Sequence, residues 1–143
     1  MRVNIDKNKS WSEILLSFLE KIWPGPVTVI FNHKEKLPAL LTGGKDTIGI
    51  RMPDHPFVAA LLARLGMPLA QTSANVSDMP PAKSAQDVKK YFEHADAAPD
   101  ILIDGGEVPG ASSVVIDCTG FSPLILRSGI MSKQDLDRML AGI

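Results

Sequence analysis

Val27-Thr28-Val29-Ile30-Phe31 is the stretch that decides the fold, because its residues are β-branched or aromatic and all but one are apolar. Such residues are enriched in strands, and a run that is apolar on both faces is typical of a strand covered from two sides. The stretch therefore predicts a strand in a sheet that helices flank.

The segment before this strand predicts an amphipathic helix. Ser10-Trp11-Ser12-Glu13 matches a capping box, in which Ser10 accepts a hydrogen bond from the backbone amide of Glu13. Apolar residues then recur at three- and four-residue steps up to Ile22, which places them on one helix face. Trp23-Pro24-Gly25-Pro26 ends the helix, because proline cannot donate a backbone hydrogen bond and restricts the residue before it.

Polar and apolar residues alternate in Thr47-Ile48-Gly49-Ile50-Arg51-Met52, which predicts a second strand. Ile48, Ile50 and Met52 would face the core, and the remaining three residues would form a polar face. Thr47 and Arg51 lie about 13 Å apart along such a strand, so they could hold opposite ends of an elongated ligand. The alternative is an ordinary exposed edge strand.

The rest of the chain alternates between predicted helices and strands. Helices are expected from Pro56 to Gly66, after Ser84 and after Ser132. Strands are expected at Ile101-Leu102-Ile103 and in a hairpin from Ser113 to Arg127. The hairpin makes the sheet mixed, so the fold class is α/β. With 143 residues and no evident linker, the chain 1–143 is expected to form one domain.

A small polar run, Gln71-Thr72-Ser73-Ala74-Asn75, follows an apolar segment. Thr, Ser and Asn side chains bond to nearby backbone, which favours a tight turn that presents hydroxyl groups outward. Small residues also leave room for a ligand. The run therefore fits a binding site and, equally well, an ordinary solvated loop.

Composition excludes several classes of protein. The net charge is −1 at pH 7, so there is no overall attraction to nucleic acid or membrane. No apolar run reaches the length of a membrane span, and the N-terminus is too polar for a secretory signal. Cys118 is the single cysteine, which suits the reducing cytosol. The three histidines lack metal-ligand spacing, so no protein-bound metal is expected.

The chemistry-bearing residues suggest catalysis by positioning. The sequence supplies hydroxyl groups and arginines at strand ends but no convincing pair of nucleophile and base. Arginine stays protonated near neutrality, so Arg51 and Arg127 would bind carboxylate or phosphate and stabilise charge. Either arginine could instead form a surface ion pair.

Five successive motifs resemble those of the YrdC/Sua5 family and cover nearly everything after about Ser10. They are Trp23-Pro24-Gly25-Pro26-Val27-Thr28, Thr47-Ile48-Gly49-Ile50-Arg51-Met52-Pro53-Asp54-His55, Thr72-Ser73-Ala74-Asn75, Ser113-Val114-Val115-Ile116-Asp117 and Leu126-Arg127-Ser128-Gly129. The resemblance implies a YrdC-like twisted mixed β-sheet flanked by helices. It also implies an L-threonylcarbamoyladenylate synthase, a nucleotidyltransferase that makes threonylcarbamoyl-AMP and pyrophosphate from L-threonine, bicarbonate and ATP with Mg²⁺.

The resemblance assigns roles to individual residues. Positions that contact ATP fall on Thr47, Ser73 and Arg127. Positions that contact threonine fall on Arg51, Gln71 and Ser113, while Thr72 and Asn75 belong to the motif that shapes the turn. The implied partners are proteins that transfer the threonylcarbamoyl group to tRNA, and RNA itself, as tRNA or as a double-stranded RNA.

Two departures from the family pattern shape the alternatives. The family usually has threonine where Val114 stands and a small residue where Gln71 stands. Members also begin with a segment bearing a Lys-x-Arg motif that nothing before Trp11 resembles, so the chain is expected to be N-terminally truncated, the C-terminal part of the family domain. The alternatives are therefore a catalytically incomplete module that binds nucleotide or RNA, and a related carbamoyl-adenylate chemistry.

Overall fold

The computed structural model describes residues 10–34, 37–76, 78–108 and 110–141, and the chain divides into two compact units. The first unit combines the residues up to Pro68 with those from Ser112 onward, and the second spans Leu69–Ala111. The single-domain interpretation stays a prediction.

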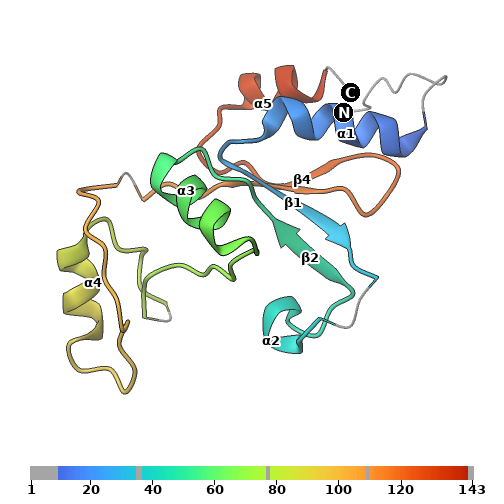
Figure 1. Ribbon diagram of the computed structural model, residues 1–143. Helices are drawn as coiled ribbons and strands as arrows, with labels where there is room; N and C mark the ends of the chain where they lie inside the picture. Colours follow the sequence, from blue (N-terminus) through green and yellow to red (C-terminus); the bar gives the residue numbers. More distant parts are fainter. Residues whose placement is uncertain (1–9, 35–36, 77, 109, 142–143) are drawn as a thin grey trace. The chain divides into compact units, whose positions relative to one another are not determined.

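The first unit is built on a four-stranded mixed sheet (Figure 1). Its strands are β1 (Val27–Asn32), β2 (Thr47–Ile50), β3 (Val114–Asp117) and β4 (Leu124–Arg127), in the order β2-β1-β3-β4. The central pair, β1 and β3, is parallel, whereas β2 and β4 run antiparallel to their neighbours at the two edges. The predicted mixed sheet and the hairpin that closes it are confirmed.

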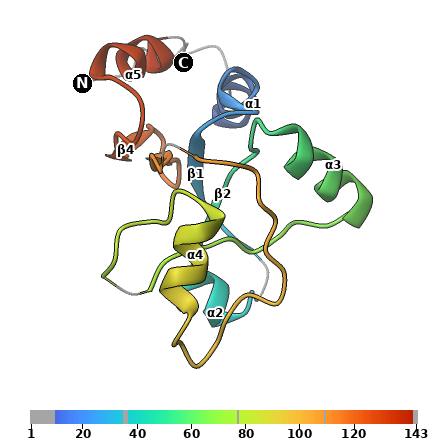
Figure 2. The same cartoon turned by 90° about the vertical axis from the view of Figure 1, so that its left-hand side faces the viewer.

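Two helices, α1 (Trp11–Ile22) and α5 (Lys133–Leu140), lie together over one face of this sheet, as Figures 1 and 2 both show. The capping box of α1 forms as predicted, and the helix ends at Ile22. The core cluster draws its buried side chains from these helices, β1, and β3 with the residue after it: Phe18, Ile22, Val27, Val29, Val114, Ile116, Cys118, Leu136 and Leu140.

The opposite face of the sheet is only half-buried. Thr28, Ile30, Val115 and Asp117 alternate with the core residues and are all of intermediate exposure. Val27, Val29, Val114 and Ile116, in contrast, are at most 2% exposed. The strand predicted from its apolar character is therefore dry on one side and partly open on the other, which leaves the open side free for polar chemistry.

The strand β2 corrects one expectation about the core. Ile48 is half-buried, but Ile50 and Met52 are 46% and 55% exposed instead of buried. The reason is position, because β2 is an edge strand and the core cluster is centred on β1 and β3. The alternation of polar and apolar residues identified the two faces of β2 correctly, but it overestimated the burial of the apolar face.

One of the two other helices of the first unit follows the sequence signals closely, and one does not. In the first unit, α3 (Pro56–Leu65) has proline in its first turn and ends at Gly66, whose φ of 64° is left-handed. The short helix α2 (Ala39–Thr42) was not predicted. No helix within the described ranges has the length and apolarity needed to cross a membrane.

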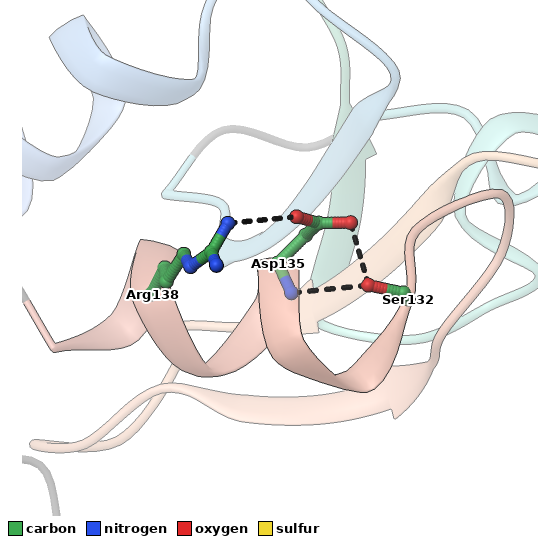
Figure 3. A network of polar contacts seen from close by, with 3 residues as sticks. All are labelled: Ser132, Asp135 and Arg138. Carbon is green, nitrogen blue, oxygen red and sulfur yellow. Dashed lines mark hydrogen bonds and ion pairs between the residues drawn. The ribbon is translucent and has the colours of Figure 1, made fainter.

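The start of α5 shows how a local polar network fixes a helix end (Figure 3). Ser132 accepts a hydrogen bond from the backbone N–H of Asp135 at 3.2 Å and donates its hydroxyl proton to the Asp135 carboxylate at 2.6 Å. Arg138 lies 3.8 Å from the same carboxylate. The cap predicted at Ser132 is confirmed.

The second unit contains α4 (Ala85–Phe92), which begins at the predicted cap Ser84. Val88 and Phe92 of α4 help to line a shallow hollow of about 300 Å³ together with Pro99 and Leu102. The predicted strand at 101–103 is wrong, since these residues have no strand partner in the described part of the unit and Ile101 is 79% exposed. An apolar run forms a strand only when a neighbouring strand satisfies its backbone groups.

We expect the Cys118 thiol to react slowly in the folded chain at pH 8. Burial raises its pKa to about 11, and the charge of Asp117 acts in the same direction. Because only the thiolate is nucleophilic, the alkylation rate should rise as the pH approaches 11. This group therefore contributes stability below about pH 9 and loses that contribution as the pH rises through the folded-state pKa.

The measurement is the rate of iodoacetamide labelling, followed by mass spectrometry, between pH 7 and the highest pH at which the fold persists. The chain unfolded in urea is the control, and it should label much faster at pH 8. Equal rates for the folded and unfolded chains at pH 8 would contradict the burial of Cys118.

Candidate functional site

Four strand ends meet at one end of the sheet and bring the predicted arginines together with two hydroxyl groups. The strands β1 and β3 begin at this end, and their antiparallel neighbours β2 and β4 finish there. Val29 pairs with Ile50, so Thr28 and the residue after β2, Arg51, reach the same end. Arg127 pairs with Val115, two residues after Ser113.

These residues also share the open face of the sheet. Ile30 lies opposite Gly49 and Asn32 lies opposite Thr47, so the predicted polar face of β2 is on the side away from the core. A Cβ atom at Gly49 would lie 3.2 Å from Cγ2 of Thr28, which shows how closely the two strands approach on this side. On β2 this face therefore carries polar side chains at both ends and a glycine without a side chain between them.

Ser113 is the centre of the polar contacts. Its hydroxyl lies 2.9 Å from that of Thr28 and accepts a hydrogen bond from Nη2 of Arg127 at 3.3 Å. Nε of Arg127 also donates to the backbone carbonyl of Ser113 at 3.1 Å. One serine thus links β1 to the end of β4, and its carbonyl and hydroxyl oxygens fix the plane of a guanidinium group by accepting two hydrogen bonds from it.

Arg51 is held by the turn that ends α1. Its Nε donates to the carbonyl of Gly25 at 3.2 Å, and the Gly25 N–H donates to the carbonyl of Met52 at 2.8 Å. Gly25 is buried, and a Cβ atom there would lie only 2.6 Å from the Ile22 carbonyl oxygen. The backbone of the Pro-Gly-Pro turn therefore holds the Arg51 side chain in place through a hydrogen bond.

Both guanidinium groups keep their positive charge available. Among the residues that the structure describes, no carboxylate lies within ion-pair distance of Arg51 or Arg127, whereas Arg138 pairs with Asp135. Two cations without a protein counter-ion at one sheet end favour an anionic ligand, such as a carboxylate or phosphate. The alternative of an ordinary surface ion pair does not hold for these two arginines within the described ranges.

Thr47 lies at the other end of β2, where it faces Asn32 across the strand pair. Four residue steps along the strand separate it from Arg51, or about 13 Å. The structure therefore does not bring Thr47 together with the arginine cluster. Thr47 and Arg51 lie at opposite ends of the polar face of β2, with Gly49 between them.

The remaining predicted residues lie in the second unit. The Gln71 side chain donates to the Thr72 carbonyl at 2.9 Å, and Thr72 and Ser73 are exposed. Asn75 donates to the carbonyls of Val76 and Met79, so its side chain ties the turn together. The assignment of these residues to ATP or threonine stays a prediction.

Three residues shape the site although sequence reasoning assigned them no role in it: Thr28, Gly25 and Gly129. Gly129 has a φ of 55°, and a Cβ atom on it would lie 2.5 Å from the Ser113 carbonyl oxygen and from the Val114 nitrogen. Only glycine fits this close approach. The signal for Thr28 was its hydroxyl in an otherwise apolar strand.

The chain belongs to the Sua5/YciO/YrdC family, which carries the description "Telomere recombination", because it matches this family over residues 4–129. It is 35% identical to the threonylcarbamoyl-AMP synthase of Pyrococcus abyssi over 125 residues and 33% identical to that of Bacillus subtilis over 129 residues. These alignments cover 87% and 89% of this chain. In both cases the chain spans 36% of the relative's own length.

Solved structures show the same fold. The crystal structure of P. abyssi Sua5 complexed with L-threonine superposes with a TM-score of 0.78 at 34% identity, covering 94% of this chain and 39% of that one. Escherichia coli YciO gives a TM-score of 0.72 at 26% identity, covering 91% and 60% respectively. The YrdC-like fold expected from the motifs is confirmed.

We expect Gly129→Ala to destabilise the chain by about 1–3 kcal/mol, because the new methyl group would overlap the backbone at Ser113 and the φ angle disfavours alanine. The measurement is the free energy of unfolding in urea. Gly120→Ala is the matched control, since nothing lies within 4 Å of a Cβ atom there. Equal stability of the two variants would show that the backbone at Gly129 is not packed as described.

Proposed function

We propose that this chain supplies part of the substrate-binding surface of an L-threonylcarbamoyladenylate synthase. The observation that carries the proposal is that two guanidinium groups without a carboxylate partner among the described residues lie at one end of the open sheet face, where Arg127 bonds to Ser113 and Arg51 bonds to the Gly25 carbonyl. The chain spans about a third of the length of the synthases that it matches. The complete synthase reaction is therefore part of the proposal.

The reaction joins L-threonine, bicarbonate and ATP to give threonylcarbamoyl-AMP and pyrophosphate. Its chemical step is attack of an N-carboxylated threonine on the α-phosphate of ATP, with pyrophosphate as the leaving group. Such a step needs alignment and neutralisation of negative charge more than a side-chain nucleophile. Two arginines and a hydroxyl cluster, without a nucleophile and base pair, suit that requirement.

The residue roles divide between the two substrates. Thr47, Ser73 and Arg127 would contact ATP, and Arg51, Gln71 and Ser113 would contact threonine. A fixed guanidinium binds carboxylate or phosphate through directed hydrogen bonds, which supports these roles for Arg51 and Arg127.

Mg²⁺ is proposed to come with the ATP phosphates. The described residues contain no group of three or more His, Cys, Asp or Glu side chains placed to hold a metal ion. The arginines and hydroxyl groups at the Ser113 end of the open face fit anions and not a cation. The metal would therefore be held mainly by phosphate oxygens, and this chain's residues would act on the substrate around it.

The product would be used by proteins that transfer the threonylcarbamoyl group to a tRNA adenosine, and the chain would act in the cytosol. The net charge of −1 supports a small-molecule role over an extended nucleic-acid surface. Binding of tRNA or double-stranded RNA is the second function to be tested. It would define a module that binds without turnover.

The test is pyrophosphate release from ATP by the purified chain, with L-threonine and bicarbonate each omitted in turn. Release that requires both co-substrates supports the synthase. Binding of AMP or tRNA without any release supports the module that binds without turnover. Replacing threonine and bicarbonate by carbamoyl phosphate separates the related carbamoyl-adenylate chemistry, and absence of binding and release overturns the proposal.

We expect Arg127→Gln to weaken AMP binding and Arg51→Gln to weaken L-threonine binding, each by about 10- to 100-fold. The reason is loss of a charge-assisted hydrogen bond to an anionic group. The measurement is the dissociation constant from titration calorimetry. Arg138→Gln is the control, because Arg138 lies on α5 and pairs with Asp135, and its affinities should match those of the unmodified chain.

A further inference from the structure

Thr28 places a hydroxyl group near the start of β1, in the most buried strand pair of the sheet. Its neighbours Val27 and Val29 are 2% and 0% exposed and face the core, whereas Thr28 faces the open side and is half-buried. Its Oγ1 lies 2.9 Å from Oγ of Ser113, which is 85 residues away in the chain. The resemblance and the comparisons give this residue no role.

We propose that Thr28 is a positioning residue of the site, which fixes the Ser113 hydroxyl and, through it, the guanidinium group of Arg127. The inference rests on the proposed function, because it concerns the same substrate-binding end of the sheet, where Ser113 and Arg127 lie. Thr28 need not touch a substrate. Its effect is exerted through the hydrogen bond across β1 and β3.

The hydrogen-bonding capacity of the Ser113 hydroxyl explains how the Thr28 hydroxyl can influence ligand binding. The group has one proton to donate and two lone pairs, and Arg127 Nη2 already occupies one lone pair. If Thr28 donates to the second lone pair, the Ser113 proton is left for an acceptor on a ligand, such as a carboxylate. If Ser113 donates to Thr28, a lone pair is left for a ligand ammonium group. An amino acid carries both groups.

Thr28 also completes an ordered chain that reaches Arg127. Nε and Nη2 of Arg127 both donate to Ser113, which leaves the N–H groups of Nη1 and the second N–H of Nη2 available for a ligand. Without Thr28 the Ser113 side chain would be free to rotate away, and the guanidinium would then keep only its bond to the backbone carbonyl. The expected consequence is a ligand-binding arginine that is present but less well oriented.

The experiment compares Thr28→Val, which keeps the branched shape and removes the hydroxyl, with Thr28→Ser, which restores it. We expect Thr28→Val to weaken L-threonine binding about 3- to 10-fold, as for loss of one neutral hydrogen bond, and Thr28→Ser to stay within about twofold. Thr119→Val is the control, because its described hydrogen bonds are made by main-chain atoms. At position 28, valine is compatible with the strand β1. Urea unfolding confirms that each variant is folded.

A second readout needs no ligand. The Nη–H signals of Arg127, assigned by their loss in Arg127→Gln, report the order of the guanidinium group through their solvent exchange rate, because Nη2 is the atom that bonds to the Ser113 hydroxyl. We expect faster exchange in Thr28→Val and restoration in Thr28→Ser. Unchanged exchange in Thr28→Val, or a Thr28→Ser variant as impaired as Thr28→Val, would overturn the inference.

The two readouts separate this inference from the proposed function. If the unmodified chain binds neither L-threonine nor AMP, the proposed function fails and so does any role of Thr28 in binding these ligands. The exchange rate of Arg127 then decides whether Thr28 positions the arginine. If the chain binds both ligands and Thr28→Val binds them as tightly as Thr119→Val, the positioning role fails while the proposed function stands.

Discussion

Burial of one face of the sheet beneath α1 and α5 is the constraint on which the rest of this structure depends. The parallel pair β1 and β3 contributes alternate side chains to the core, and this alternation fixes the register of both strands. A shift by one residue would bring Thr28 and Val115 into the core and expose Val27 and Val114. The apolar core therefore determines which hydroxyl groups face the open side.

The direction of the strands then assembles the polar cluster. Because β2 and β4 run antiparallel to the central pair, residues at the ends of the edge strands meet residues at the starts of the central strands. Arg51 and Arg127 reach Thr28 and Ser113 in this way, from positions that are far apart in sequence. Backbone groups complete the arrangement, since Gly25 supplies the acceptor for Arg51 and Gly129 permits a close approach to Ser113. Two of the determinants of this site are therefore glycines with no side-chain chemistry of their own.

The errors of sequence reasoning share one physical cause, which is that local pattern does not report the neighbours of a strand. The run at 101–103 has strand composition but lacks a partner, and Ile50 has the alternation of a core residue but lies on an edge strand. Helix ends were more predictable, because a capping serine such as Ser10 or Ser132 acts within one turn of its own helix. Predictability thus followed the sequence separation of the interacting groups.

The sequence by itself determined where α1, α3, α4 and α5 begin, the four strands of the mixed sheet, the polar face of β2 and the membership of the family. Periodicity, caps and turn residues act over a few positions, so they can be read without knowing the fold. Only the tertiary structure decided that Arg127 is oriented by Ser113 and Ser113 by Thr28, since the bond between the two hydroxyl groups joins residues 85 positions apart. It also decided that both site arginines lack a carboxylate partner among the described residues, because only packing determines which charges come close together.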